Sequence, residues 1–209
     1  MAAAERLFAE HGVASVSARQ IGEAAGQGNT AAVGYHFGTK TGLIKAIIAQ
    51  HAAAVERIRS RMAEEAGASG GLRDWIACMV RPSTEHLAAL GAPTAFARFA
   101  VQILADPRLR PLLLEATFAT PAIGTVLAGL DRCLSGLPDP VRTARDDMAY
   151  SLILHVVARH ERELAEGTSA TSWADTATML TDALTGLFTA PVTSESTSDS
   201  TCSYLGESS

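Results

Sequence analysis

The chain has 209 residues, of which 47% are hydrophobic and 19% are charged, a composition that suits a folded chain with a buried core. No apolar run approaches the roughly 18 residues of a membrane span, and the first residues lack the regions of a signal peptide, so we expect a cytoplasmic protein. The three cysteines, Cys78, Cys133 and Cys202, have no metal-ligand spacing, which predicts free thiols in a reducing compartment.

Charge is divided unevenly along the chain. Residues 1–61 contain seven Lys or Arg against four Glu, whereas the remainder contains ten against eighteen acidic residues, and the formal net charge is −5. A slightly basic N-terminal region is compatible with DNA binding there, and the acidic remainder disfavours it elsewhere.

The N-terminal quarter is predicted to contain four helices. The first covers 2–11 and ends at Gly12. The second begins after Ser17, which forms a capping box with Gln20, while Val16 and Ile21 supply a hydrophobic staple.

A tight turn over 26–29 follows, with Asn29 as the cap of a short third helix that ends near Phe37. Thr39 caps a long fourth helix that continues to about Gly67. The core of these four helices is expected to contain Leu7, Phe8, Val16, Ile21, Ala25, Val33, Phe37 and Leu43.

Gly, Pro and capping signals divide the rest of the chain into further helices. Asp139 and Pro140 are predicted to be an N-cap and a first helical residue, and Ser172 forms a capping box with Asp175. We find no alternating strand pattern, so the fold class is all-α. The expected helices cover 72–90, a segment that ends near 106, 109–118, 122–134, 139–167 and 172–188.

A short helix, a tight turn and a second short helix form the unit that places a helix in the major groove of DNA. An ordinary helical corner gives the same pattern, so the pattern alone leaves DNA binding open. Asn29 and Thr30 are suited to base edges, and the starts of the second and fourth helices, with Ser17, Arg19 and Thr39, are suited to phosphates.

These residues also carry a family resemblance. The stretches Leu7-Phe8-Ala9-Glu10-His11-Gly12, Ser17-Ala18-Arg19-Gln20-Ile21-Gly22, Ala24-Ala25-Gly26 and Tyr35-His36-Phe37-Gly38-Thr39-Lys40-Thr41-Gly42-Leu43 closely resemble, in order and spacing, the DNA-binding region of the tetracycline-repressor (TetR) family. The resemblance covers about the first 50 residues. It implies an all-helical homodimer, a variable ligand-binding body, and repression that an effector relieves.

By position, the resemblance makes 29–37 the recognition helix and Lys40 a phosphate contact. Gly34 stands where an aromatic residue is common, and the chain begins inside the family's first helix without a basic lead. Either further residues precede Met1, or DNA affinity is weak. The candidate DNA contacts are Ser17, Arg19, Asn29, Thr30, Ala31, Gly34, Tyr35, His36, Thr39 and Lys40.

The body supplies candidates for an effector pocket and for a dimer interface, although core packing explains the same residues. The pocket candidates are Trp75, Met79, Phe96, Phe99, Ile103, Phe118 and Tyr150. The interface candidates are Met148, Leu152, Val156, Trp173, Ala177, Leu180, Leu184 and Leu187.

Catalytic and metal-binding alternatives find little support. His155 and His160 are five residues apart and do not share a helix face, so we interpret them and Glu161 as polar surface residues. No phosphate-loop or nucleophile signature is present, so we expect no enzyme, no cofactor and no metal.

The sequence therefore predicts a helix-turn-helix domain over 1–50, a helical effector-binding and dimerisation domain over 51–189, and a disordered Ser/Thr-rich tail over 190–209. The predicted function is that of a transcriptional repressor, released from a palindromic DNA operator by a small, mostly apolar effector. The alternative is a helical dimeric ligand-binding or interaction module with weakened or lost DNA binding.

Overall fold

A computed structural model describes residues 1–26 and 37–193, and within these ranges every regular element is an α-helix. The predicted all-α class is confirmed. Most of the predicted third helix and the end of the Ser/Thr-rich tail lie outside the described residues.

The N-terminal helices begin and end close to the predicted residues. They are α1 (Ala2–His11), α2 (Ala18–Ala24) and α4 (Lys40–Ala66). Ser17 and Gln20 form the predicted capping box, in which the Ser17 N–H donates to Gln20 Oε1 at 2.8 Å. Thr39 caps α4, because its Oγ1 accepts a hydrogen bond from the Gly42 N–H at 3.0 Å.

Six further helices form the body. They are α5 (Leu72–Leu90), α6 (Phe96–Ala105), α7 (Arg110–Phe118), α8 (Pro121–Cys133), α9 (Asp139–Ala165) and α10 (Trp173–Thr189). Asp139 was expected to be the N-cap, but α9 begins at Asp139 with Pro138 as its N-cap. The predicted Ser172–Asp175 capping box opens α10.

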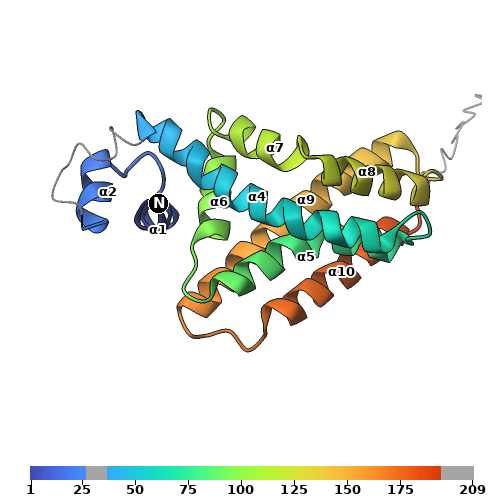
Figure 1. The fold of residues 1–209 in the computed structure, drawn as a ribbon. Coiled ribbons are helices and arrows are strands. Elements are labelled where there is room, and N and C mark those ends of the chain that lie inside the picture. Colours follow the sequence, from blue (N-terminus) through green and yellow to red (C-terminus); the bar gives the residue numbers. More distant parts are fainter. Residues whose placement is uncertain (27–36, 194–209) are drawn as a thin grey trace, which may run out of the picture.

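The helix α4 connects the two ends of the molecule. Figure 1 shows α1 and α2 at one end and α4 running from them through the body, with α7 and α8 on one side and α5 and α10 on the other. Within the described residues no single helix is long and apolar enough to cross a membrane, and α7 and α8 reach that length and composition only as a pair bent by 76°.

Two hydrophobic clusters form the core. The first, which we call the head cluster, contains Phe8 of α1, Ile21 of α2 and Ile47 of α4, and residues of α6 and α7 complete it. The second lies among α4, α5, α6, α8, α9 and α10. Ala25 was predicted to lie in the core, but it follows the last residue of α2 as its C-cap and is exposed.

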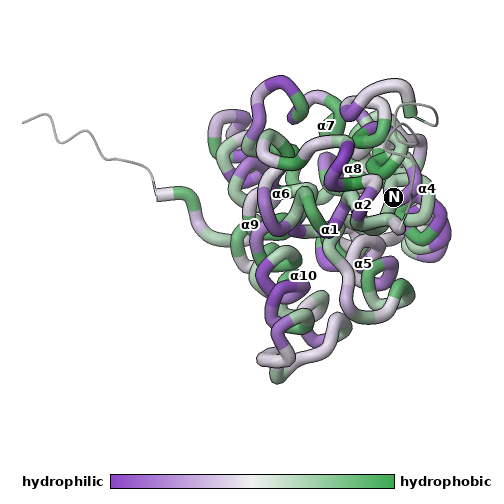
Figure 2. Tube along the Cα trace, turned by 90° about the vertical axis from the view of Figure 1, so that its left-hand side faces the viewer, coloured by the Kyte–Doolittle hydropathy of each residue, from purple (hydrophilic) through white to green (hydrophobic). Residues whose placement is uncertain are grey.

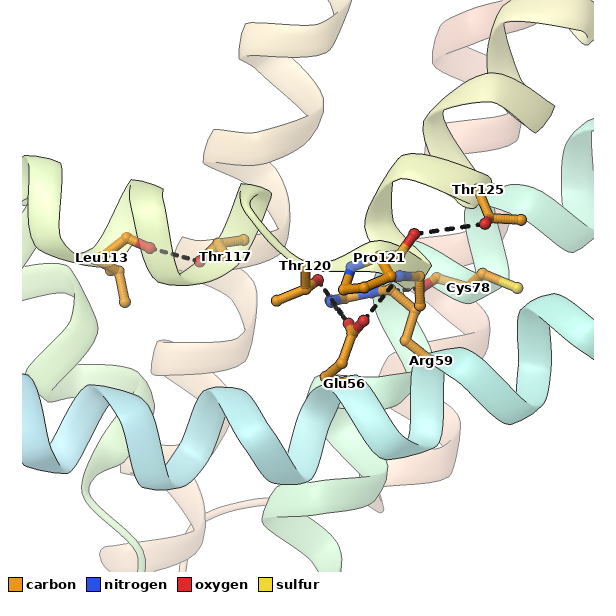
Figure 3. Close-up of polar contacts among 9 residues, drawn as sticks. Glu56, Arg59, Cys78, Leu113, Thr117, Thr120, Pro121 and Thr125 are labelled. Carbon is orange, nitrogen blue, oxygen red and sulfur yellow. Dashed lines mark hydrogen bonds and ion pairs between the residues drawn. The ribbon is translucent and has the colours of Figure 1, made fainter.

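Two carboxylates, one buried and one half-buried, join helices that are far apart in the sequence. Glu161 of α9 is 1% exposed and accepts the backbone N–H groups of Ala97 and Arg98 at the start of α6. Glu56 of α4 accepts the Ala122 N–H at the start of α8 (Figure 3). Each carboxylate thus caps a helix from outside it.

The surface interpretation of the 155–161 segment was partly wrong. His155 is exposed, but His160 and Glu161 are buried, because this face of α9 packs against α6 and α10.

Candidate DNA-binding head and effector cavity

The start of α2 presents two of the candidate DNA contacts to solvent. Ser17 and Arg19 are both exposed, and the Arg19 Nε donates to Glu23 Oε1 at 2.8 Å. This hydrogen bond raises the pKa of the Arg19 guanidinium. Because both partners are exposed, the pair is weak and leaves Arg19 available to a phosphate.

Lys40 was expected to contact a phosphate, but its ammonium group already contacts the protein. The Nζ atom donates to the carbonyl oxygen of Val16 at 2.6 Å and lies 5.8 Å from the centre of the Phe8 ring. Burial lowers the pKa of this half-buried lysine. Lys40 therefore fastens the start of α4 to the segment between α1 and α2, and an ammonium group has two further N–H donors for DNA.

The backbone before α4 passes unusually close to the helix. A Cβ atom at Gly42 would lie 2.2 Å from the carbonyl oxygen of Phe37. Only glycine permits this approach, which fixes Phe37 and Thr39 relative to α4. The remaining candidate contacts, Asn29, Thr30, Ala31, Gly34, Tyr35 and His36, lie outside the described residues.

A polar network that the sequence did not reveal joins the head to the body. Glu5 of α1 lies 2.9 Å from Nε2 of His51 on α4, and Nδ1 of His51 lies 2.8 Å from Nε2 of His86 on α5. Because a carboxylate only accepts, His51 donates through Nε2, and a neutral His51 then accepts the Nε2–H of His86. His51 also stacks on Phe96, with ring centres 3.7 Å apart.

A cavity of about 130 Å³ lies in the body between α4, α5, α6, α7 and α9. Four of the seven pocket candidates line it, namely Met79, Phe96, Phe118 and Tyr150. The other lining residues are Ile48, Ala52, Val55, Arg59, Ser83, Ala100, Leu113, Ala116, Thr117, Ile153 and Leu154.

The other three pocket candidates are core residues. Trp75 packs flat against the backbone of Gly129, where an added Cβ would lie 2.3 Å from the ring, and its Nε1 donates to the Gly70 carbonyl at 2.9 Å. Phe99 and Ile103 belong to the head cluster, and the Phe99 ring stacks on Phe8 at 5.9 Å. The spacing of large apolar residues in the sequence does not distinguish a residue of the packed core from one that lines a cavity.

The apolar stripe of α10 faces its own chain. Ala177, Leu180 and Leu184 are 1–3% exposed, since α10 packs on α5 and α9. They were wrongly predicted to face a partner. Val156, Trp173 and Leu187 lie half-buried at the edge of the same cluster.

Two of the interface candidates are exposed. Met148 is 56% exposed and Leu152 is 37% exposed, and Met179 of α10, which the sequence analysis omitted, is 53% exposed. Figure 2 shows hydrophobic and hydrophilic residues alternating along α9 and α10, which is typical of amphipathic helices.

A capped short helix α2, a core that fixes it against α1 and α4, and exposed polar residues at its start fit the first helix of a helix-turn-helix unit. Residues 1–47 match the model of the family described as bacterial regulatory proteins, tetR family. The N-terminal region is therefore a tetR-family domain, and the protein is a DNA-binding transcriptional regulator. A comparison with curated proteins found no match.

Proposed function

We propose that the protein is a cytoplasmic homodimeric repressor that leaves a palindromic operator when a small effector enters the cavity. The observation that carries this proposal is that α4 belongs to both sites. Thr39 is its N-cap and Lys40 its first residue, and four residues of the same helix, Ile48, Ala52, Val55 and Arg59, line the cavity. A ligand that moves α4 would change the position of the head.

The head includes residues 1–50 and the ligand-binding and dimerisation region includes 51–189. The proposed DNA contacts are Ser17, Arg19, Thr39, Lys40 and the six candidates between Asn29 and His36. Charge is compatible with this division, because residues 1–50 contain four Lys or Arg against three Glu, whereas the remainder contains thirteen against nineteen acidic residues.

Dimerisation is proposed to use the exposed side of α9 and α10. Met148, Leu152 and Met179 are large apolar side chains left open to solvent there. Two heads held by such an interface would meet successive major grooves about 34–36 Å apart, and the link between them would raise the effective concentration of the second head.

Selection of bound sequences from random DNA tests the proposal. The selected sequences are expected to contain a palindrome whose half-sites are one or more helical turns apart. Sedimentation of the complex should show one dimer bound to each palindrome. The absence of any enriched sequence would favour the alternative, a dimeric ligand-binding module without DNA binding. A second test is the variant Thr30→Ala, which should change the base preference of the protein at one or two base pairs, at a cost of about 1–3 kcal/mol for each lost contact.

A further inference from the structure

The cavity wall contains one buried cation. Arg59 of α4 lies among apolar residues such as Met79 and Ile153 and is 5% exposed. A buried guanidinium loses its hydration, so it needs compensating partners nearby.

The partners of Arg59 within the described residues do not satisfy it. Its Nε donates to the Cys78 carbonyl oxygen at 3.4 Å, and its Nη1 lies 3.5 Å from Glu56 Oε2, both at the long end of hydrogen bonding. Glu56 itself is held by the start of α8, through the Ala122 N–H at 2.8 Å and the Thr120 hydroxyl at 2.6 Å (Figure 3). Both oxygens of Glu56 are therefore shared with other, closer donors, and its ion pair with Arg59 is long.

Two hydroxyl groups extend the polar part of the cavity. Ser83 of α5 and Tyr150 of α9 line it, and neither side chain has a hydrogen-bond partner among the described residues. Burial raises the pKa of Tyr150, so its hydroxyl stays protonated and can donate. The guanidinium and the two hydroxyls offer donors, which suits an acceptor-rich ligand group.

We propose that the cavity binds a small organic acid whose carboxylate pairs with Arg59 and whose apolar body lies against Met79, Phe96 and Ile153. A carboxylate matches the planar fork of a guanidinium and forms two parallel charge-assisted hydrogen bonds. The space of about 130 Å³ is close to that of a cavity known to hold one benzene ring. The ligand class is thus a monocyclic aromatic or short-chain acid, and this inference rests on the proposed effector site.

Calorimetry on the DNA-free full chain tests the charge preference, with benzoate and its neutral isostere benzamide as probes. Benzoate is expected to bind about tenfold or more tightly than benzamide. Arg59→Met should remove this preference or reverse it, whereas Arg59→Lys should retain part of it. The matched control is Arg61→Met, an exposed residue two positions further along α4, which should leave the preference unchanged.

Equal affinity of the wild-type protein for benzoate and benzamide would overturn the inference, as would an unchanged preference in a folded Arg59→Met variant. Failure to bind benzoate and every acid from butyrate to octanoate would overturn it too. If Arg59→Met fails to fold, Tyr150→Phe is expected to weaken benzoate severalfold, and no weakening would count against the site. Because these measurements omit DNA, they are independent of operator binding, and a protein that binds benzoate but no operator would refute only the proposed function.

Discussion

The ammonium group of Lys40 serves the fold of the head before any DNA is bound. Lys40→Met removes its hydrogen bond to Val16 and keeps most of the aliphatic chain. We expect the free energy of unfolding to fall by about 1 kcal/mol. The variant should also bind all DNA sequences more weakly. If the ammonium group contacts a phosphate, the slope of log affinity against log salt concentration should fall by about one unit.

Urea denaturation and salt-dependent anisotropy measure the two effects. Lys45→Met, an exposed change on the same helix, is the control for stability. An unchanged unfolding free energy in Lys40→Met would mean that the contact with Val16 contributes nothing.

The pH dependence of stability follows from His86. Burial lowers its pKa below the ordinary value of 6.5, with smaller effects of His51 and Arg57 in the same direction and of Glu5 in the opposite one. As pH falls, His86 is therefore protonated in the unfolded chain before it is protonated in the folded chain. The contribution of neutral His86 to the free energy of unfolding is present above pH 6.5 and is lost as pH falls below it. His86→Gln should reduce this loss in thermal unfolding between pH 7 and pH 5.

The same shift at His160 adds to the loss, so His86→Gln removes only part of it. His155→Gln, on the exposed face of α9, is the control and should leave the pH profile unchanged. A profile that is identical in His86→Gln and the wild type would show that His86 is not responsible.

At the scale of helices, α6 depends on a cap that α9 provides. Glu161→Gln replaces one carboxylate oxygen by an NH₂ group that faces a backbone N–H of Ala97 or Arg98. We expect the free energy of unfolding to fall by about 3 kcal/mol, because the buried ion pair with Arg98 is lost as well. Urea denaturation measures this, and Glu163→Gln, at a more exposed pair with Arg159, should change little. Similar losses in both variants would contradict the capping role.

Local signals predicted most helix starts, and interactions between distant residues were missed. Ser17, Thr39 and Ser172 cap the helices they precede, because each cap and its partner are three residues apart. Glu56 and Glu161 cap helices more than sixty residues away along the chain, which no local pattern reveals.

The same limit applies to the stripes of apolar residues. Leu180 and Leu184 have the spacing of an interface, but the spacing does not say which neighbour covers them, and α5 of the same chain does. Four residues of the cavity wall were found through their size and apolar character, whereas Arg59 and Ser83 were missed because polar residues give no pocket signal.

At the scale of the whole molecule, association and folding can be separated. Leu152→Glu places a charge on an exposed position of α9, so a dimer that buries this face should dissociate while the chain stays helical. Leu184→Glu places the charge in the core and should unfold the chain instead. Sedimentation and circular dichroism distinguish the two outcomes. A folded Leu152→Glu variant that remains dimeric would place the interface elsewhere.

The head cluster affects how this regulator could be re-engineered. Phe8 and Ile47 pack with Phe99 and Ile103 of α6 and with Leu113 of α7, so part of the head's interior is supplied by sequence beyond residue 95. In a hybrid regulator joined at residue 50, Phe8 would pack against side chains of a different volume from another protein. Such mismatches in a core commonly lower the free energy of unfolding by about 1–3 kcal/mol. Exchange of DNA specificity should therefore succeed better when α6 and α7 are transferred together with the head, or when only the reading residues are grafted.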